Sequence, residues 1–567
     1  MKKRVISVLL LLTFLLGCIV STKNETEKSI RQNTEEKYEI ARTTPFGKYP
    51  EEVTYTLGKM TSSNNSNLPE GDTYEDNVYT RYLKEMLNIQ NVDAFEEDSV
   101  TYYDIVDMAI AEKNLPDVML VQGLDSLQTL VENDLIADLT DSYNQCASER
   151  IKDIYASYDE SVLGNVTFDG KLMALPETNI SDGPQLLWLR KDWMDQLGLE
   201  APRTLADAEH IIQEFVAKDP GGNGAGNTIG LACENEICGE MGRNYEYHLD
   251  VLFASYDSYP QQWMKDEEGK LYYGGVQPQT KEALARVREW YEKGIIDKQF
   301  LMRTNNNIAD AIIEGKCGAF FGPWWAPNNP LMEAVQKDPL AKWQPYLLSN
   351  TEEGTNRFAQ QNASTQYVVV RKGYEHPEIV MKMISVLFDY VRYTDIDNEN
   401  FAHYYQWNVD PTARPIYINV DYNDALNRCY DALTAALQRK RGKESLELLE
   451  QSYYEHCLTY LQNPRKATSD QWAAYTSRIT ACELLSQAQT EEIKTYYFAE
   501  TDTMRSVWWK LKEMQKQTYL EIITGEKPLD YFDSFVEQWY ENGGETILAE
   551  VSAEVTREEE TENEGEE

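Results

Sequence analysis

Short apolar runs of strand length alternate along this chain with segments whose apolar residues recur at helical spacing. The runs lie at residues 53–57, 117–121, 186–189 and 366–370. The helical segments include residues 77–89, 100–113, 124–132 and 279–293. A strand that is apolar throughout is buried on both faces, and helices that separate such strands form βαβ units. The pattern therefore predicts an α/β protein with mainly parallel sheets, followed by a mostly helical part at residues 423–545.

The chain begins with a segment typical of exported proteins. Residues 1–4 are basic and residues 5–16 are apolar, a run too short to span a bilayer. The sequence Leu-Leu-Gly-Cys at residues 15–18 resembles a bacterial lipobox. This implies that residues 1–17 are a lipoprotein signal peptide and that Cys18 carries the lipid. An ordinary signal peptide with an incidental cysteine is the alternative.

Two polar segments flank the part of the chain that we expect to fold. Residues 18–48 contain few large apolar side chains, and residues 553–567 are acidic. Such compositions bury too little apolar surface to offset the entropy lost when a chain becomes ordered. We therefore predict a flexible tether at residues 18–48 and a disordered acidic tail at residues 553–567.

Charge and cysteine content narrow the classes of function. The 567-residue chain has a formal net charge of −42, whereas nucleic acids and anionic membrane surfaces bind basic protein surfaces. We therefore expect no nucleic-acid partner, and contact with the membrane only through the lipid anchor. The seven cysteines after Cys18 are odd in number and scattered, so they do not indicate a disulfide framework. Cys233 and Cys238 either pair locally or remain free thiols.

Several motifs occur in an order that resembles one family. Residues 170–176 read GKLMALP, and residues 190–204 read RKDWMDQLGLEAPRT. Residues 219–224 read DPGGNG, and residues 315–325 read GKCGAFFGPWW. In order and spacing these motifs resemble the extracellular solute-binding proteins of bacterial ABC importers, in particular the large lipoprotein members. The resemblance extends from about residue 50 to about residue 555.

The resemblance implies a two-lobed, type II periplasmic-binding-protein-like fold in which the chain crosses between the lobes. Each lobe would contain a mainly parallel sheet flanked by helices. Lobe 1 is expected at residues 49–178, with a return at residues 358–410. Lobe 2 is expected at residues 179–357, and it continues with the C-terminal helices through residues 411–552.

The aromatic turn that ends the last motif is the first candidate for a ligand contact. In open α/β sheets, ligands bind at the carboxyl ends of strands, where Trp324 and Trp325 would lie. An indole ring covers the C–H face of a sugar, and alternation along the strand buries one of the two rings and exposes the other. We expect Trp324 to make the contact, and Trp324→Ala to leave the stability of the ligand-free protein unchanged. The alternative is that this tryptophan packs under the lobe.

Polar partners for sugar hydroxyl groups are expected from Gln122, Glu177 and Glu240. Gln122 follows an apolar strand and is otherwise an ordinary loop residue. Trp407 belongs to an aromatic cluster that either lines the ligand cleft or packs on the C-terminal helices. Together with the two tryptophans of the turn, these residues complete the expected ligand site.

The glycine-rich loop at residues 219–228 resembles the calcium loop of some family members but lacks most of its acidic residues. Asp219 occupies position 1, Asn223 position 5 and Asn227 position 9, whereas position 3 is Gly221. Calcium prefers several charged oxygen ligands, and this loop supplies one carboxylate. We therefore predict weak or absent calcium binding and no other cofactor.

The family resemblance implies a lipid-anchored protein on the extracellular face of a bacterial cell membrane. As a monomer it would capture a solute, expected to be an oligosaccharide, by lobe closure and deliver it to an ABC transporter permease. One alternative is a secreted glycoside hydrolase, whose paired carboxylates cannot be recognised by spacing among 95 acidic residues. Another is an adhesion lipoprotein without a transport role. The lack of HExxH, GxSxG and Walker motifs favours a protein that is not an enzyme.

Overall fold

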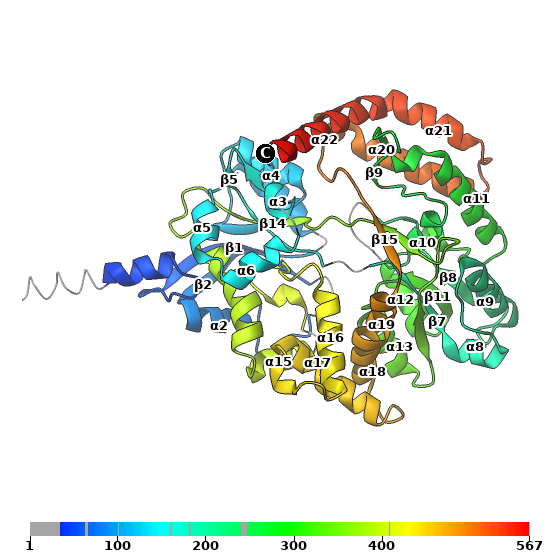
Figure 1. Ribbon diagram of the computed structural model, residues 1–567, viewed down its shortest axis with the longest axis horizontal. Helices are drawn as coiled ribbons and strands as arrows, with labels where there is room; N and C mark the ends of the chain where they lie inside the picture. Colours follow the sequence, from blue (N-terminus) through cyan, green and yellow to red (C-terminus); the bar gives the residue numbers. More distant parts are fainter. Residues whose placement is uncertain are drawn as a thin grey trace, which may run out of the picture. The chain divides into compact units, whose positions relative to one another are not determined.

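The computed structural model describes residues 34–62, 66–99, 101–158, 161–180, 183–239, 246–407 and 409–565, and the chain divides into two compact units (Figure 1). Unit 1 comprises Met1–Gln122, Ser126–Glu177 and Gln366–Val420. Unit 2 comprises Gly123–Asp125, Thr178–Thr365 and Asp421–Glu567. No helix in the described ranges has an apolar stretch long enough to cross a bilayer.

Unit 1 contains a five-stranded mixed sheet with the strand order β2-β1-β3-β14-β6. Its strands are β1 (Val53–Thr61), β2 (Ile89–Asp98), β3 (Val118–Gln122), β6 (Leu175–Pro176) and β14 (Gln366–Val370). β1 runs parallel to β2 and β3, whereas β14 is antiparallel to β3 and β6. All of β14 and all but the last residue of β3 are buried, as their largely apolar sequences predict for central strands.

Helices contact this sheet, and local sequence sets where they begin. At the start of α2 the side chain of Asn77 accepts hydrogen bonds from the backbone N–H groups of Tyr79 and Thr80, and α2 ends at Asn88 in the left-handed region. The helices of unit 1 include α2 (Val78–Leu87), α3 (Tyr102–Glu112), α4 (Leu124–Glu132, whose first two residues belong to unit 2), α5 (Thr140–Cys146), α6 (Glu149–Ala156), α14 (Ile379–Ser385) and α15 (Glu399–Gln406).

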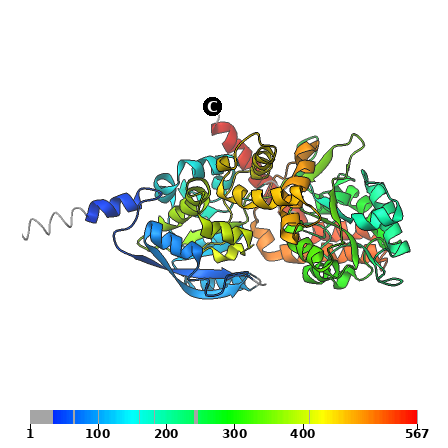
Figure 2. The ribbon, with the colours of Figure 1, turned by 90° about the horizontal axis from the view of Figure 1, so that it is seen from below.

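The described part of the chain opens with a helix at residues 34–42, within the segment predicted to be a flexible tether. Its C-terminal end meets unit 1, as Figures 1 and 2 show. The buried Lys382 of α14 donates hydrogen bonds to the carbonyl oxygens of Ala41 (2.7 Å) and Thr44 (2.6 Å), which satisfies groups that a helix end leaves open. The tether prediction is therefore wrong for this end of the segment. The rest of the tether, like the signal peptide and Cys18, lies outside the described residues.

Unit 2 contains a four-stranded sheet with the strand order β12-β7-β11-β8. Its strands are β7 (Leu186–Arg190), β8 (Ile229–Ala232), β11 (Cys317–Gly322) and β12 (Trp343–Tyr346). β11 is parallel to β8 and antiparallel to β7, and β7 is antiparallel to β12. Every residue of β7, β8 and β11 is buried, so this sheet forms the centre of the unit.

The motif RKDW forms the junction between β7 and α8 (Lys191–Leu197). The guanidinium of Arg190 donates to both carboxylate oxygens of Asp192, at 2.9 and 2.7 Å, and lies 4.7 Å from the ring of Trp193. Thr204 then begins α9 (Leu205–Lys218) through a capping box with Asp207. These motif residues build the fold of unit 2.

The rest of unit 2 is largely helical, with two additional pairs of short strands. Its helices include α10 (Asp250–Ala254), α11 (Pro278–Glu292), α12 (Asn305–Ile313), α13 (Met332–Lys337), α16 (Ala425–Leu437), α17 (Leu448–Gln462), α18 (Ser469–Tyr475), α19 (Cys482–Gln487), α20 (Asp502–Thr524), α21 (Tyr531–Trp539) and α22 (Glu545–Gly565). The short strands are β9 (Trp263–Lys265) with β10 (Leu271–Tyr273), and β13 (Asn356–Ala359) with β15 (Thr490–Ile493). This agrees with the helical pattern predicted for residues 423–545.

The chain crosses between the units at positions that differ from the expected lobe boundaries. The backbone N–H of Asn179 donates to the carbonyl oxygen of Ala363 at 2.8 Å, which keeps this later segment in unit 2. The chain returns to unit 1 at Gln366 instead of residue 358, and it leaves unit 1 after Val420 instead of residue 410. Pairing between β13 and β15 explains the later return, because it binds the end of the segment to the C-terminal part of the chain.

Helix α22 occupies the segment for which we predicted a disordered acidic tail. Ile547, Val551 and Val555 are buried at intervals of four residues, so the first turns of the helix pack on the core of unit 2. The carboxylate of Glu550 also accepts a hydrogen bond from the hydroxyl of Thr503 in α20, at 2.6 Å. The prediction of disorder from residue 553 is wrong, because a helix nucleated by packed turns extends into polar sequence at little further cost.

Candidate ligand-binding site

One end of the unit 2 sheet brings several loops together. β8 and β11 end there while β7 begins there, since β11 is parallel to β8 and antiparallel to β7. Gln185 directly precedes β7, and Pro323 directly follows β11. Open α/β sheets bind ligands at the carboxyl ends of their parallel strands, which makes this end the candidate region for a site in unit 2.

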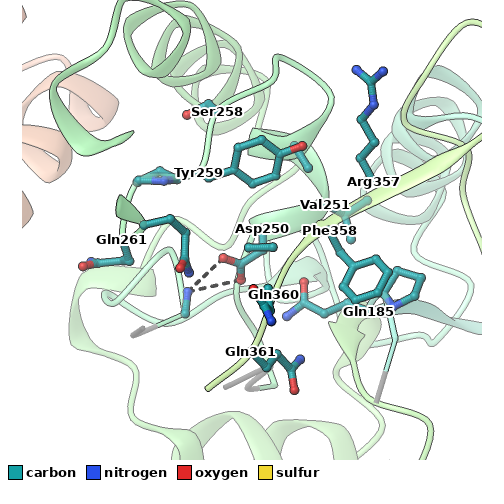
Figure 3. Close-up of a pocket in the computed structure, with 16 residues that line it drawn as sticks. Gln185, Asp250, Val251, Ser258, Tyr259, Gln261, Arg357, Phe358, Gln360 and Gln361 are labelled. Carbon is teal, nitrogen blue, oxygen red and sulfur yellow. Dashed lines mark hydrogen bonds between the residues drawn. The ribbon is translucent and has the colours of Figure 1, made fainter. Parts of the chain in front are cut away.

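A pocket with polar and aromatic walls opens beside Gln185 (Figure 3). Its cavity has a volume of about 50 Å³. A space of that size holds a few water molecules or one hydroxymethyl group, not a whole sugar ring. The walls come from the loop before β7, from α10, from the turn after α10 and from β13 with the residues that follow it. They include Gln185, Asp250, Tyr259, Gln261, Gln262, Arg357, Phe358, Gln360 and Gln361.

Thr495, just after β15, orients two of the glutamine side chains. Its hydroxyl donates to the amide oxygen of Gln262 at 2.7 Å, and its backbone N–H donates to the amide oxygen of Gln360 at 3.2 Å. With the oxygens held in this way, the NH₂ groups are the ends of these side chains that can donate to another group.

Two polar atoms of the pocket are buried without a hydrogen-bond partner in the described part of the chain. They are the hydroxyl of Tyr259 and the amide nitrogen of Gln361. A buried polar group of this kind costs free energy until a ligand or a water molecule supplies the missing partner. Sugar hydroxyl groups both donate and accept, so they suit a wall of amides and a phenol.

Asp250 is the carboxylic acid among the described residues of the pocket wall. Both of its carboxylate oxygens lie within hydrogen-bond distance of the backbone N–H of Gly239, at 3.0 and 3.2 Å (Figure 3). Burial raises the pKa of Asp250 to about 6, against the hydrogen bond from Gly239, which lowers it. At neutral pH this carboxyl group is mostly ionised and can accept hydrogen bonds from a donor that enters the pocket. Glycoside hydrolysis uses two carboxyl groups across the scissile bond, and the described residues of this wall supply one.

The aromatic turn after β11 places its two tryptophans differently from our expectation. Trp324 is 5% exposed and packs in the hydrophobic cluster on one side of the unit 2 sheet, whereas Trp325 is half-buried. The guanidinium of Arg478 lies over the ring of Trp324, 4.4 Å from its centre. One ring is buried and the other is half-buried, so Trp325 is the more accessible of the two. The role expected of Trp324 as a ligand contact stays a prediction.

In unit 1 the structure brings Gln122 and Glu177 to the same end of the sheet. Gln122, at the exposed end of β3, stands opposite Gln366 at the start of β14. The backbone N–H of Glu177, which follows β6, donates to the carbonyl oxygen of Gln366 at 2.9 Å. Both side chains therefore lie at the carboxyl ends of parallel strands, which agrees with a ligand-binding role.

The other two predicted polar and aromatic contacts are not joined to these groups. Trp407 follows α15 in unit 1, is 53% exposed and stacks on His403 with their ring centres 5.2 Å apart. Glu240 lies outside the described residues.

Hydrogen bonds among its own residues stabilise the glycine-rich loop of unit 2. The carboxylate of Asp219 accepts from the backbone N–H groups of Asn223 (2.9 Å) and Gly224 (2.8 Å) and from the hydroxyl of Thr228 (2.6 Å). These bonds, that of Thr228 first, hold the pKa of Asp219 below its usual range. A Cβ atom at Gly221 would lie 2.5 Å from the ring of Trp193, so position 3 has no room for an oxygen ligand.

The amide side chains of Asn223 and Asn227 also point their nitrogens, not their oxygens, at neighbouring atoms. Asn227 donates to the carbonyl oxygen of Asn223 at 3.0 Å, and Asn223 donates to the hydroxyl of Thr228 at 3.2 Å. Calcium needs oxygen ligands, so this arrangement offers it few. Weak or absent calcium binding stays a prediction, and the geometry supports it.

The sequence did not predict the pocket beside Gln185, which we call the glutamine pocket. Its residues come from positions near 185, 250–262 and 357–361, with Thr495 behind them, and no single window contains more than a part of it. One signal was present in the sequence, namely the two Gln-Gln pairs at residues 261–262 and 360–361. The side-chain amides of two pairs of adjacent glutamines in loops are not needed for the hydrogen bonds of helices and strands. They therefore indicate a capacity to bind other groups.

Comparisons with known proteins agree with this architecture. A family model described as bacterial extracellular solute-binding protein matches residues 65–389. The polygalacturonan/rhamnogalacturonan-binding protein YtcQ of Bacillus subtilis is 25% identical over 250 residues, which are 43% of this chain and 46% of YtcQ. The fructooligosaccharide ABC transporter substrate-binding protein FusA of Streptococcus pneumoniae is 27% identical over 169 residues, which are 28% of this chain and 30% of FusA. The matches thus span less than half of either relative.

A solved structure extends the likeness in fold over most of the chain. The substrate-binding protein FusA of S. pneumoniae, in complex with kestose, aligns with 90% of this chain and 100% of its own, with a TM-score of 0.60 at 15% identity. This confirms the predicted α/β fold of the type II periplasmic-binding-protein kind.

Proposed function

This chain belongs to the family of bacterial extracellular solute-binding proteins, and we propose that it captures an oligosaccharide and delivers it to an ABC importer. The glutamine-rich pocket of unit 2 is the observation that carries the choice of ligand. It presents amide groups, a phenol and one carboxylate, which match the dense hydroxyl groups of a sugar. The names of the relatives YtcQ and FusA, both of which refer to carbohydrates, support the same class.

We assign the ligand contacts by chemistry. The amide groups of Gln261 and Gln360 and the hydroxyl of Tyr259 bind sugar hydroxyl groups, and the half-buried ring of Trp325 covers a sugar face. Within unit 1, Gln122 and Glu177 stay the proposed polar contacts to a sugar. We propose binding without hydrolysis, which the single carboxyl group in the described pocket wall supports, since hydrolysis uses two.

The cellular location is part of the proposal. A lipid on Cys18 holds the protein on the extracellular face of the cell membrane, where it works as a monomer. The support is the Leu-Leu-Gly-Cys sequence behind a 12-residue apolar segment. In whole cells, Cys18→Ala should release the protein from the membrane fraction into the medium. Protein that stays in the membrane fraction would contradict lipidation at this residue.

The proposed function is tested by calorimetric titration of the purified protein with a panel of neutral and acidic oligosaccharides. We expect at least one to bind, with no products detectable by chromatography after prolonged incubation. Turnover would favour a glycoside hydrolase, and a panel without binding would contradict the proposal.

Tyr259→Phe then tests the pocket itself. The lost hydroxyl has no partner within the described residues, so we expect affinity to fall about tenfold while the melting temperature stays the same. Tyr272→Phe is the matched control, since Tyr272 is a half-buried residue of unit 2 that does not line the pocket. An unchanged affinity in Tyr259→Phe would exclude this hydroxyl from the site.

A further inference from the structure

Arg478 of unit 2 lies between two aromatic rings. It belongs to the short π-helical segment Thr476–Ala481, which joins α18 to α19. Its guanidinium carbon lies 4.4 Å from the ring centre of Trp324 and 4.5 Å from that of Tyr453 in α17. α17 and α18 lie side by side in unit 2 (Figure 1), so the turn after α18 brings Arg478 to Tyr453. The faces of the two rings attract the guanidinium cation electrostatically, and the rings exclude water from the faces of the guanidinium.

The guanidinium of Arg478, which is partly exposed, has few acceptors among the described residues. Of its N–H groups, one donates to the hydroxyl of Tyr453 at 3.3 Å and another points at the sulfur of Cys429 at 4.0 Å. Its Nε atom is buried without a partner, and no carboxylate within the described residues pairs with it. Buried charges are usually paired, because an unpaired one loses its hydration without compensation. Arg478 therefore has unused capacity to bind an anion.

The surroundings of Arg478 are those of a sugar-binding surface. Trp324 follows β11 at the carboxyl end of the unit 2 sheet, the end at which Gln185 enters the glutamine pocket. Trp325 and Trp472 pack against the same hydrophobic cluster as Trp324, and each remains partly exposed. Arg478 is itself partly exposed, so an approach from solvent is open.

We propose that Arg478 binds a carboxylate of the ligand and that the oligosaccharide is an acidic one, built with uronic acid residues. This inference rests on the proposed function and names its substrate class. A planar guanidinium donates two parallel hydrogen bonds to a carboxylate, and such charge-assisted bonds are about twice as strong as neutral ones. The hydroxyl groups of a neutral sugar would leave the charge uncompensated.

The charge of the whole chain makes a dedicated cation necessary for such a ligand. With a formal net charge of −42, the protein repels anions at long range. An acidic oligosaccharide therefore binds only where a local positive group outweighs that repulsion. Arg478 supplies this group at a place where aromatic rings shield it from water.

The test is calorimetric titration of the wild-type protein and Arg478→Met with trimers of galacturonate, glucuronate and mannuronate. Each trimer is paired with its methyl ester, which has the same ring but no charge. We expect a free acid to bind the wild type about 10- to 100-fold more tightly than its ester, and Arg478→Met to lose this difference. Arg478→Lys keeps the positive charge but loses the planar guanidinium with its two parallel donors. It should therefore retain part of the preference for the free acid.

Arg428→Met provides a matched control. The guanidinium of Arg428 also lies over an aromatic ring, that of Tyr422 at 4.0 Å, but it pairs with the carboxylate of Asp424 at 2.6 Å. This variant should keep the wild-type preference for the free acid. A circular dichroism spectrum and melting curve show whether Arg478→Met is folded, and Arg478→Lys serves in its place if it is not.

The possible results separate this inference from the proposed function. Binding of neutral oligosaccharides with no preference for free acids would overturn the inference and leave the proposed function standing. A preference for acids that survives in both Arg478→Met and Arg478→Lys would overturn it as well. If neither acidic nor neutral oligosaccharides bind, both proposals fail.

Discussion

Two arginines of unit 2 lie against tryptophan rings, yet they differ in their partners. Arg190, at the junction of β7 and α8, lies 4.7 Å from Trp193 and donates two hydrogen bonds to the carboxylate of Asp192. Arg478 lies 4.4 Å from Trp324 and has no carboxylate partner in the described ranges. The ring contact is common to both, so the counter-ion is what separates them.

The comparison indicates that a charged side chain paired with an opposite charge stabilises the fold, whereas a charged side chain without such a partner can bind a ligand. Asp192, which pairs with Arg190, also accepts a hydrogen bond from the backbone N–H of Lys342 at 3.0 Å. That bond ties the start of α8 to the residue before β12, so the pair holds two parts of the unit together. Arg478 lacks such an ionic link, because its one oxygen partner among the described residues is the uncharged hydroxyl of Tyr453 in α17.

The largest expected effect is the difference in stability between Arg190→Met and Arg478→Met. Arg190 is 5% exposed, and its loss leaves the charge of Asp192 without its partner, so we expect a destabilisation of about 3–5 kcal/mol. Arg478→Met removes a partly exposed charge that has no carboxylate partner in the described ranges, and it should change the stability by less than about 1 kcal/mol. Urea unfolding followed by tryptophan fluorescence measures both, because Trp407 is the one tryptophan outside unit 2. Equal losses would show that Arg478 also holds the fold.

The next effect concerns the two tryptophans of the turn. Trp324 is 5% exposed, so Trp324→Ala leaves a cavity and should destabilise unit 2 by about 3 kcal/mol. This reverses the expectation, drawn from the sequence, that the variant keeps the stability of the ligand-free protein. Trp325→Ala removes a half-buried ring and should cost about 1 kcal/mol while weakening sugar binding. The opposite order of stabilities in urea would contradict the placement of the two rings.

The parts of the fold that could be predicted are those that depend on local apolar patterns. The apolar runs at residues 117–121, 186–189 and 366–370 became the central strands β3, β7 and β14, because a strand buried on both faces needs apolar side chains throughout. The motif RKDW was recognisable because its contacts lie within four consecutive residues. The acidic tail and the tether were mispredicted, since composition does not reveal that Val555 or Ala41 finds a buried place on a distant segment.

The candidate site was harder to predict, since its polar groups are joined only by the fold. Gln262 and Gln360 are positioned by Thr495, which lies more than 130 residues beyond them in the chain. Polar side chains in loops follow no periodicity that would reveal such neighbours. The unpaired state of Arg478 is equally invisible, because the sequence does not show which of 95 acidic residues are near it.

A further prediction tests whether the charge of a carboxyl group in the pocket, that of Asp250, also affects the stability of the fold. Burial raises the pKa of Asp250 to about 6 in the folded protein, against 3.8 for an ordinary aspartate. Between about pH 4 and pH 6 the folded state therefore holds a proton that the unfolded state has lost. The contribution of Asp250 to stability is highest below pH 4 and declines by about 3 kcal/mol as the pH rises through 6.

Asp250→Asn removes this titration. The free energy of unfolding of the variant, measured by urea titration at pH values from 4 to 7, should fall less with rising pH than that of the wild type. Asp310→Asn, at an exposed position of the same unit, should keep the wild-type slope. If Asp250→Asn shows the same pH dependence as the wild type, Asp250 does not titrate in this range.

The smallest expected effect is that of calcium. It tests whether a charged group that already has partners is unavailable to a ligand. Asp219 resembles Arg190 in that its carboxylate already has partners, here the N–H groups of Asn223 and Gly224 and the hydroxyl of Thr228. A calcium ion would have to replace these donors and would gain one carboxylate, since the ring of Trp193 closes position 3 at Gly221. Millimolar calcium should therefore shift the melting temperature by less than about 1 °C relative to a sample with chelator. Calcium retained by the purified protein at micromolar concentration in equilibrium dialysis would show that the loop exchanges its internal hydrogen bonds for a metal.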